Sequence, residues 1–201
     1  MPSPNSLTPF SLIAREIAPD LRRGEVGILP TDTLYGIVGS ALNARTVRKI
    51  YSLRRRNPTK PMIVLIADLR DLARFGITPA RAAHAIVKRV WPGKVSVVLP
   101  IGNSAAKKFK YLHRGTNTLA FRLPRPAWLR SLLKKTGPLV APSANFEGKP
   151  PARTVAEAKK YFGDKVKFYV DFGRVASKPS TLIAINGGEV KVLRKGAVKI
   201  H

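Results

Sequence analysis

The chain has 201 residues, and 44% of them are hydrophobic, which is enough for the core of one compact domain. Its 37 Lys and Arg residues against 11 Asp and Glu give a formal net charge of +26, so its partners are expected to be anionic. The sequence has no cysteine, which excludes disulfides, thiolate metal sites and a cysteine nucleophile.

No apolar run is long enough to cross a membrane, and the first residues lack the basic head and apolar stretch of a signal peptide. We therefore expect a soluble, cytoplasmic protein without a membrane partner. Residues 1–201 are expected to form one domain, with 1–8 as a flexible tail, because no linker or repeat interrupts the chain. The three histidines are far apart in sequence, so no metal site built from protein groups is predicted.

In the first quarter of the chain, hydrophobic spacing predicts a helix from residue 9 to residue 23. A short apolar strand, 26–29, then leads into a polar turn that contains Thr31, Asp32 and Thr33. Asn43 is expected to cap a second helix that ends near residue 53.

A cationic loop follows that helix. Arg54, Arg55, Arg56 and Lys60 stand within seven residues, and prolines at 58 and 61 make the loop stiff. Such a loop suits the binding of an anion.

The middle of the chain alternates strands and helices. Strands are predicted at 63–66, 95–99 and 118–123, and helices at 68–75, 78–90 and 126–135. The basic stretch 101–115 has little periodicity, which predicts a mobile flap or connection. Strand alternation places Thr118, Ala120 and Arg122 on one face. A buried arginine needs an anion, so Arg122 is expected to meet either a bound carboxylate or phosphate, or an internal Asp or Glu.

The segment Val140 to Pro151, VAPSANFEGKPP, predicts a rigid loop at the end of a buried strand, because Gly148 and the two prolines prevent regular structure. Ser143 and Asn145 can converge on one ligand only if this loop is not a flat strand. Taken alone, such a segment is more often a turn stabilised by its own side chains than a binding site.

In the last quarter, Thr154 and Glu157 form the pattern of a capping box before a helix that ends near 162. A strand is predicted at 168–171, and strands 182–185 and 190–193 read as a hairpin around residues 186–188. The interleaved strands and helices with a final hairpin predict an α/β fold with a mixed sheet.

Polar and cationic residues gather at the ends of these predicted strands, where α/β sheets usually build their sites. Together they describe a pocket rich in hydroxyls and cations, suited to a nucleoside triphosphate and a small carboxylate. The sequence has no GxxxxGK[ST] and no GxGxxG motif, so neither a P-loop nor a dinucleotide fold accounts for phosphate binding.

Several separate motifs occur in the order of a known family: LPTDTLYGI, SLRRRNPTKPMIVL, WPGKVSVVLP, LAFRLP, APSANFEG, KPSTLI and VLRKGAV. From about residue 17 to the end, the chain resembles the YrdC family of threonylcarbamoyl-AMP synthases. The resemblance implies a twisted mixed sheet with surrounding helices and a basic concave cavity. It also implies the conversion of L-threonine, bicarbonate and ATP into threonylcarbamoyl-AMP and pyrophosphate, with Mg²⁺ held mainly by the ATP phosphates. The product would pass to a downstream tRNA threonylcarbamoyl transferase.

The resemblance also implies site residues, position by position. Threonine would contact Thr33, Arg122 and Ser180, and ATP would contact Arg56, Lys60, Thr118, Ser143 and Arg194. Catalysis would depend on Arg54, Arg56, Ser143 and Asn145.

Three positions differ from the family pattern. Arg54 stands where a lysine is usual, Glu147 where a small hydroxyl residue is usual, and Asn57 where a proline is frequent. A carboxylate at 147 would oppose phosphate binding unless it points away or meets Lys149.

Two other functions remain open on the sequence alone. The charge also suits an RNA-binding module of the same fold, in contact with tRNA or double-stranded RNA but without synthase activity. The cationic residues are spread along the chain, which equally indicates a generally basic surface. A carbamoyl-adenylate enzyme of the hydrogenase-maturation type is disfavoured, because that class carries additional cysteine-containing domains.

Overall fold

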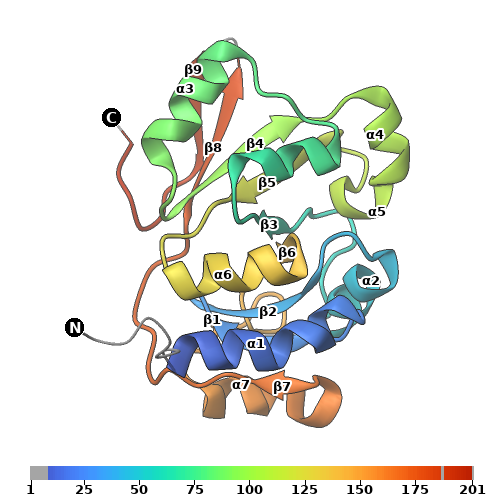
Figure 1. Ribbon diagram of the computed structural model, residues 1–201, viewed down its shortest axis with the longest axis vertical. Helices are drawn as coiled ribbons and strands as arrows, with labels where there is room; N and C mark the ends of the chain where they lie inside the picture. Colours follow the sequence, from blue (N-terminus) through green and yellow to red (C-terminus); the bar gives the residue numbers. More distant parts are fainter. Residues whose placement is uncertain (1–8, 187, 201) are drawn as a thin grey trace, which may run out of the picture.

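The computed structural model describes residues 9–186 and 188–200 (Figure 1). The expected tail, 1–8, and Gly187 of the hairpin turn lie outside the described residues. The described chain forms a nine-stranded sheet in the order β7-β1-β2-β6-β3-β5-β4-β8-β9. The strands are β1 (Gly27–Pro30), β2 (Tyr35–Ser40), β3 (Ile63–Leu65), β4 (Val95–Pro100), β5 (Thr118–Arg122), β6 (Leu139–Val140), β7 (Phe168–Tyr169), β8 (Thr181–Asn186) and β9 (Glu189–Arg194).

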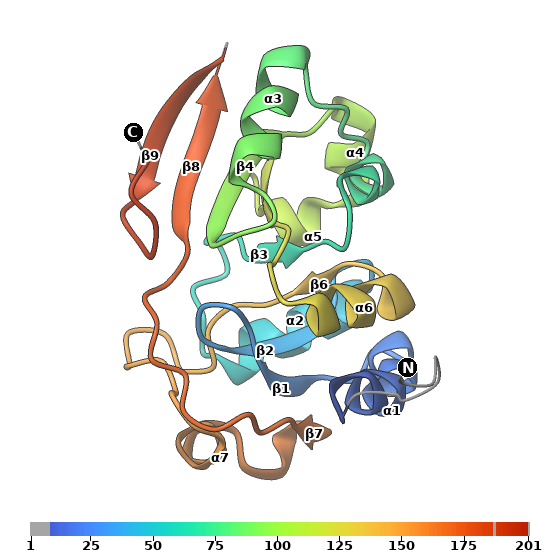
Figure 2. The same cartoon turned by 60° about the vertical axis from the view of Figure 1, so that its left-hand side comes forward.

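The sheet is mixed, as predicted. Strand β5 runs parallel to β3 and antiparallel to β4, and β8 runs parallel to β4 and antiparallel to β9. Figures 1 and 2 show a strongly twisted sheet, in which β8 and β9 run across the direction of β1 and β2. The predicted α/β class and the C-terminal hairpin are therefore confirmed.

Strand β2 was not predicted as a strand, because two glycines interrupt its apolar pattern. Its first five residues are nevertheless buried, between β1 and β6. A Cβ on Gly39 would lie 2.4 Å from the Cγ2 atom of Thr46. Gly39 therefore lets helix α2 (Ala44–Leu53) pack closely on this strand.

The remaining helices surround the sheet: α1 (Pro9–Arg22), α3 (Arg81–Val90), α4 (Asn103–Lys108), α5 (Lys110–His113), α6 (Ala127–Thr136), α7 (Val155–Phe162), and the 3₁₀ helices η1 (Leu69–Phe75) and η2 (Gly163–Lys165). Asn43 caps α2 as predicted, since its Oδ1 accepts hydrogen bonds from the N–H groups of Arg45 and Thr46. Only half of the expected capping box forms at α7. The Oγ1 atom of Thr154 accepts from the N–H of Glu157, but the Glu157 carboxylate accepts from Arg153 N instead.

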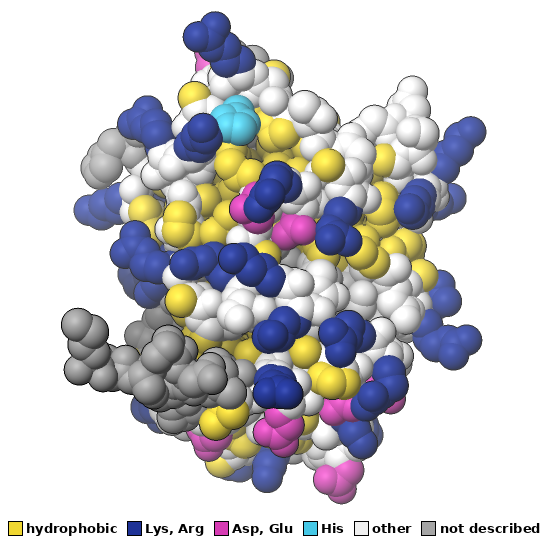
Figure 3. All heavy atoms as spheres, viewed as in Figure 1, with side chains coloured by type: hydrophobic (Ala, Val, Ile, Leu, Met, Phe, Trp, Pro, Cys, Tyr) yellow, Lys and Arg dark blue, Asp and Glu magenta, His cyan; other side chains and the backbone are white. Residues whose placement is uncertain are grey.

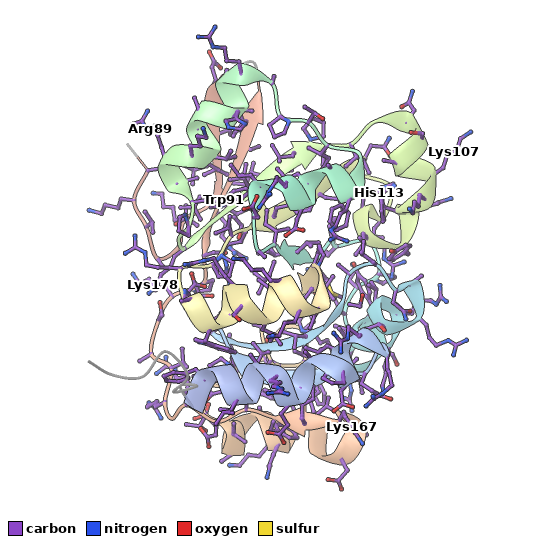
Figure 4. The ribbon with its side chains drawn as sticks, viewed as in Figure 1. Arg89, Trp91, Lys107, His113, Lys167 and Lys178 are labelled. Atoms are coloured by element: carbon purple, nitrogen blue, oxygen red, sulfur yellow. The ribbon has the colours of Figure 1, made fainter. Side chains whose placement is uncertain are left out.

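The basic stretch 101–115 is not the flap that its low periodicity predicts. It forms α4 and α5, and it buries Phe109, Leu112 and His113. His113 Nδ1 accepts hydrogen bonds from the N–H groups of Gly115 and Asn117, so Nε2 donates its hydrogen to the Ala106 carbonyl 2.9 Å away. Figure 4 shows His113 beside these helices. Packing in the core therefore fixes this segment. Its two helices are too short to show a hydrophobic period in the sequence.

Two other boundaries differ from expectation. Residues 69–75 form a 3₁₀ helix, and α3 begins at Arg81 rather than at residue 78. The extended backbone of Ala80, with φ −58° and ψ 157°, sets that start. His84 lies half-buried on α3.

Phe75 occupies the centre of the larger hydrophobic core, where its ring contacts Phe109 at 5.0 Å and Phe121 at 5.1 Å between centroids. Replacing Phe75 by alanine should lower the free energy of unfolding by about 3–5 kcal/mol, because it leaves a cavity. Urea unfolding measures this loss. Phe10→Ala is the control, since that ring is 46% exposed, and an equal loss in both variants would contradict the assignment.

Basic side chains cover the surface in Figure 3, whereas the fewer acidic ones lie mostly toward its lower end. Arg89, Lys107, Lys167 and Lys178 extend from separate edges of the molecule (Figure 4). On the face shown, the basic side chains are therefore spread out rather than gathered on one patch. Among the described helices, none is long and apolar enough to span a membrane.

Candidate active site

A cavity of about 390 Å³ opens where six strands and four connecting segments meet. Figure 2 turns this side of the sheet to the left, with the β8–β9 hairpin above the loop that follows β6. Its polar lining consists of four arginines and several hydroxyls, and no Asp or Glu of the described chain lines it. Such a lining suits phosphate or carboxylate groups.

The cavity brings together eight of the ten residues that the sequence singles out: Thr33, Arg54, Arg56, Thr118, Arg122, Ser143, Ser180 and Arg194. The face predicted for β5 is confirmed, because Thr118, Ala120 and Arg122 all line the cavity. Within the described chain, the other two candidates, Lys60 and Asn145, are not lining residues.

The loop after β6 is fixed on the start of β2. Ile37 N–H donates to the Pro142 carbonyl at 3.0 Å, and Ala144 N–H donates to the Tyr35 carbonyl at 2.8 Å. Asn145 is buried, and its Nδ2 donates to the Phe146 and Lys149 carbonyls, both at 2.7 Å. Ser143 lines the cavity, whereas Asn145 holds the loop from behind through its hydrogen bonds to backbone carbonyls.

Arg54 joins the cationic loop to this segment from inside the protein, where it is almost fully buried. Its Nε donates to the carbonyls of Ser143, at 2.9 Å, and Asn145, at 3.2 Å. Its Nη2 donates to the side-chain oxygens of the same two residues, at 3.3 and 3.2 Å. Within the described residues, the buried Nη1 has no hydrogen-bond partner. Arg54 thus holds the loop with one edge and retains a donor for an anion.

Burial, together with the nearby charge of Arg56, lowers the pKa of Arg54 to about 10, while the charge of Glu147 opposes the shift. Arg54 nevertheless remains a cation at neutral pH. The cavity therefore keeps a fixed positive charge beside Ser143.

Arg122 has an internal acid as a partner, which is one of the two kinds of anion expected from the sequence. Its Nη2 lies 3.2 Å from Oδ1 of Asp32, and each side chain is only 4% exposed. Its Nη1 donates to Oγ1 of Thr33 at 3.1 Å, and its buried Nε has no partner among the described residues. Burial lowers the pKa of Arg122, as does Arg194, whereas Asp32 raises it. The Nε donor remains available to a ligand.

From the sequence, Asp32 was predicted only to lie in a polar turn. It also accepts a hydrogen bond from Arg125 N–H, at 3.3 Å, so it ties the turn after β1 to the end of β5. The signal in the sequence is that Asp32 is the only carboxylate in that turn, while Arg122 is a buried cation without a partner nearby in the chain.

Ser180 and Arg194 form the opposite wall. Arg194 Nη2 donates to the Ser180 carbonyl at 2.8 Å and to its Oγ at 3.2 Å. Ser96 was not among the predicted site residues, but its hydroxyl oxygen lies 2.8 Å from that of Ser180. A lone hydroxyl within the apolar run of β4 was the available signal. Burial lowers the pKa of Arg194, and the charge of Arg56 adds to this effect.

Arg56 donates hydrogen bonds to backbone carbonyls of the cationic loop itself. Arg56 Nε donates to the Lys60 carbonyl at 3.2 Å, and its Nη2 donates to the Pro61 carbonyl at 3.0 Å. The hydroxyl of Tyr51 also donates to the Lys60 carbonyl, at 2.9 Å. The stiffness expected of this loop therefore comes from hydrogen bonds as well as from its prolines.

Glu147 meets Lys60 rather than Lys149, the partner considered from the sequence. Its Oε1 lies 2.8 Å from Lys60 Nζ, and its Oε2 accepts from the N–H of Asn57. The fold brings Lys60 to Glu147 because Glu147 N–H donates to the Arg54 carbonyl at 2.9 Å.

The hydrogen bond from Asn57 and the contact with Lys60 lower the pKa of the Glu147 carboxyl from 4.5 to about 2. A lowered pKa means that this contribution to stability is complete above pH 4.5 and disappears as the pH falls toward 2. Carbon-13 NMR titration of the carboxyl should show the lowered pKa, and Lys60→Met should raise it. A titration near 4.5 in the unmodified protein would contradict these contacts.

Comparisons with known proteins show the family to which this chain belongs. The Sua5/YciO/YrdC family profile, described as "Telomere recombination", matches residues 20–196. A putative threonylcarbamoyl-AMP synthase of Methanocaldococcus jannaschii is 31% identical over 187 residues, which cover 90% of this chain and 84% of that protein.

Two structures of Sua5 from Pyrococcus abyssi are 28% identical to this chain and cover 92% of it. The H234A/Y235A variant has a TM-score of 0.84, and the complex with L-threonine has a TM-score of 0.82. The chain spans 57% and 54% of those two longer chains, respectively. With a profile match over most of its length and a relative above 30% identity, the chain belongs to the Sua5/YciO/YrdC family.

Proposed function

We propose that this protein is an L-threonylcarbamoyladenylate synthase, which converts L-threonine, bicarbonate and ATP into threonylcarbamoyl-AMP, pyrophosphate and water. The observation that carries the proposal is the cavity itself, which gathers four arginines and at least five hydroxyls without a lining carboxylate. Relatives named threonylcarbamoyl-AMP synthase and the L-threonine complex of Sua5 support it.

The threonine end of the cavity is assigned to Arg122, Thr33 and Ser180. The Nε donor of Arg122 would bind the amino-acid carboxylate, while Asp32 and Thr33 hold the other two nitrogens in place. A buried arginine gives a strong charge-assisted hydrogen bond to a carboxylate. The Ser180 hydroxyl would then contact the polar groups of threonine.

The nucleotide end is assigned to Arg56, Thr118, Ser143 and Arg194, with Lys60 at the rim. Their role is to orient the phosphates and to offset the charge that develops when the α-phosphorus is attacked. Arg54 and Asn145 act on the same step by fixing Ser143, and Nη1 of Arg54 adds a donor.

The reaction would begin with N-carboxylation of threonine by bicarbonate, with loss of water. The carbamate oxygen then forms a bond to the α-phosphorus, and the bond to the bridging oxygen breaks to release pyrophosphate. A carbamate is already a nucleophile, so this step needs no strong protein base. The surrounding arginines stabilise the added negative charge.

Mg²⁺ fits this site if the phosphates supply most of its ligands. The described lining offers hydroxyls but no carboxylate, so hydroxyls such as those of Thr118 and Ser143 are the side-chain oxygens that the protein could add to the phosphate ligands. When bound, the ion would offset charge on the phosphates and assist the departure of pyrophosphate.

Pyrophosphate release tests the proposal. The purified protein should release pyrophosphate from ATP and Mg²⁺ only when threonine and bicarbonate are both present, and serine should replace threonine poorly. Release that ignores threonine, or no release at all, would contradict it.

An RNA-binding module without activity is the alternative. It would bind RNA with a steep salt dependence and ignore threonine. Arg89, Lys107, Lys167 and Lys178 lie apart in Figure 4, whereas the cavity collects four arginines and several hydroxyls in one place. We also propose that the product passes to a tRNA threonylcarbamoyl transferase. The protein would contact tRNA directly and act in the cytoplasm.

A further inference from the structure

Glu147 connects the two loops that border the nucleotide end of the cavity. It is the only acidic residue between 140 and 151, and its carboxylate contacts Lys60 Nζ and Asn57 N–H on the cationic loop. Its own N–H donates to the carbonyl of Arg54. The carboxylate and the backbone of one residue thus hold the cationic loop against the Ser-Ala-Asn segment.

This contact sets Lys60 apart from the arginines of the site. The side chains of Arg54 and Arg122 are buried, and protein groups hold their guanidinium groups in place. The Lys60 side chain is 58% exposed, and that of Glu147 is 25% exposed. An exposed ion pair is weak and rearranges without breaking the core. Lys60 is therefore a cation that can change partners.

The two possible partners of Lys60 have the same sign. A phosphate group at the nucleotide end would attract Lys60, and the Glu147 carboxylate would both compete for Lys60 and repel the phosphate. Pro61 and Met62 line the cavity, so Lys60 directly precedes the lining in sequence.

We propose that Glu147 is an intramolecular competitor of the ATP phosphates for Lys60 and thereby weakens nucleotide binding. The inference rests on the proposed function, because it needs a nucleotide in this cavity. When ATP binds, Lys60 leaves Glu147 for a phosphate oxygen. When pyrophosphate leaves, Glu147 takes Lys60 back, which favours release.

Glu147→Gln isolates the charge, because glutamine keeps an oxygen that accepts from Asn57 N–H. Calorimetric titration with ATP and Mg²⁺ should show a Kd about two- to fivefold lower than that of the unmodified protein, the range expected for an exposed ion pair. The difference should shrink as salt is added. Titration with inorganic pyrophosphate should show the same change, and the Kd for threonine should stay the same.

Further variants separate competition for Lys60 from a general effect of removing one negative charge. Glu25→Gln removes the same charge from a residue that pairs with a lysine, Lys49, at 3.4 Å and that does not line the cavity, so its Kd for ATP should be unchanged. In a Lys60→Met background, Glu147→Gln should tighten ATP binding less than it does alone, because the contested cation is gone. Glu147→Ser is the second variant if glutamine disturbs the loop, and thermal unfolding verifies the fold of each protein.

The outcomes separate this inference from the proposed function. If the unmodified protein binds ATP but Glu147→Gln and Glu147→Ser bind it equally well or more weakly, Glu147 only supports the loop and the inference is wrong. If Glu147→Gln tightens ATP binding equally with and without Lys60, Glu147 does not compete for Lys60 and the inference is wrong. If the unmodified protein binds neither ATP nor pyrophosphate, the proposed function fails, and the inference with it.

Discussion

Replacing Arg122 by glutamine should raise the Kd for threonine by about a hundredfold or more. The reason is that a buried, charge-assisted contact with the substrate carboxylate is lost. The same change leaves Asp32 as a buried, unpaired carboxylate, which should also destabilise the fold by about 3–5 kcal/mol. Calorimetric titration with threonine and urea unfolding measure the two effects separately.

The double variant Asp32→Asn with Arg122→Gln removes both charges of the pair. It should recover most of the lost stability but not the threonine affinity. A stable double variant that binds threonine as the unmodified protein does would show that Arg122 is a structural residue and not the carboxylate site.

Arg54→Ala should have the second large effect. It removes the four hydrogen bonds that hold Ser143 and Asn145, and buried acceptors without a donor are costly. We expect a loss of about 3 kcal/mol in the free energy of unfolding. We also expect a fall of about a hundredfold or more in kcat/KM for ATP. Urea unfolding and steady-state pyrophosphate release measure the two quantities.

Neighbouring changes provide the controls for Arg54. Arg55→Ala removes an exposed arginine that stacks on Phe146 at 4.4 Å, so its cost should be about 1 kcal/mol or less, with activity retained. Arg54→Lys keeps the charge but lacks the planar fork, and it should fall between the unmodified protein and Arg54→Ala. Equal behaviour of Arg54→Ala and Arg55→Ala would contradict the role assigned to Arg54.

The fold was predictable where a segment carries its own signal. The strands near residues 63, 95 and 118 are β-branched, apolar runs, and Asn43 marks the start of α2. Strand β2 and helices α4 and α5 were missed, because glycines hide the strand and neither helix exceeds six residues. What holds them in place is packing against distant parts of the chain, such as Phe109 on Phe75, which a local pattern does not contain.

The composition of the site was more predictable than its internal order. Hydroxyls and arginines at strand ends indicated one anion-binding pocket, and the structure brings eight of them together. The local sequence did not show that Asp32 would pair with Arg122, that Ser96 would reach Ser180, or that Glu147 would meet Lys60. Each of these contacts joins residues more than fifty positions apart, so each depends on the order of strands in the sheet.

Mass spectrometry of the reaction product is the most decisive measurement. The protein would be incubated with ATP, Mg²⁺, threonine and carbon-13 bicarbonate, and the adenylates would be analysed at once. A synthase should yield threonylcarbamoyl-AMP that carries the labelled carbon, with unlabelled bicarbonate giving the matching lighter species. Absence of the labelled adenylate, together with salt-sensitive RNA binding that ignores threonine, would contradict the synthase and support an RNA-binding protein of the same fold.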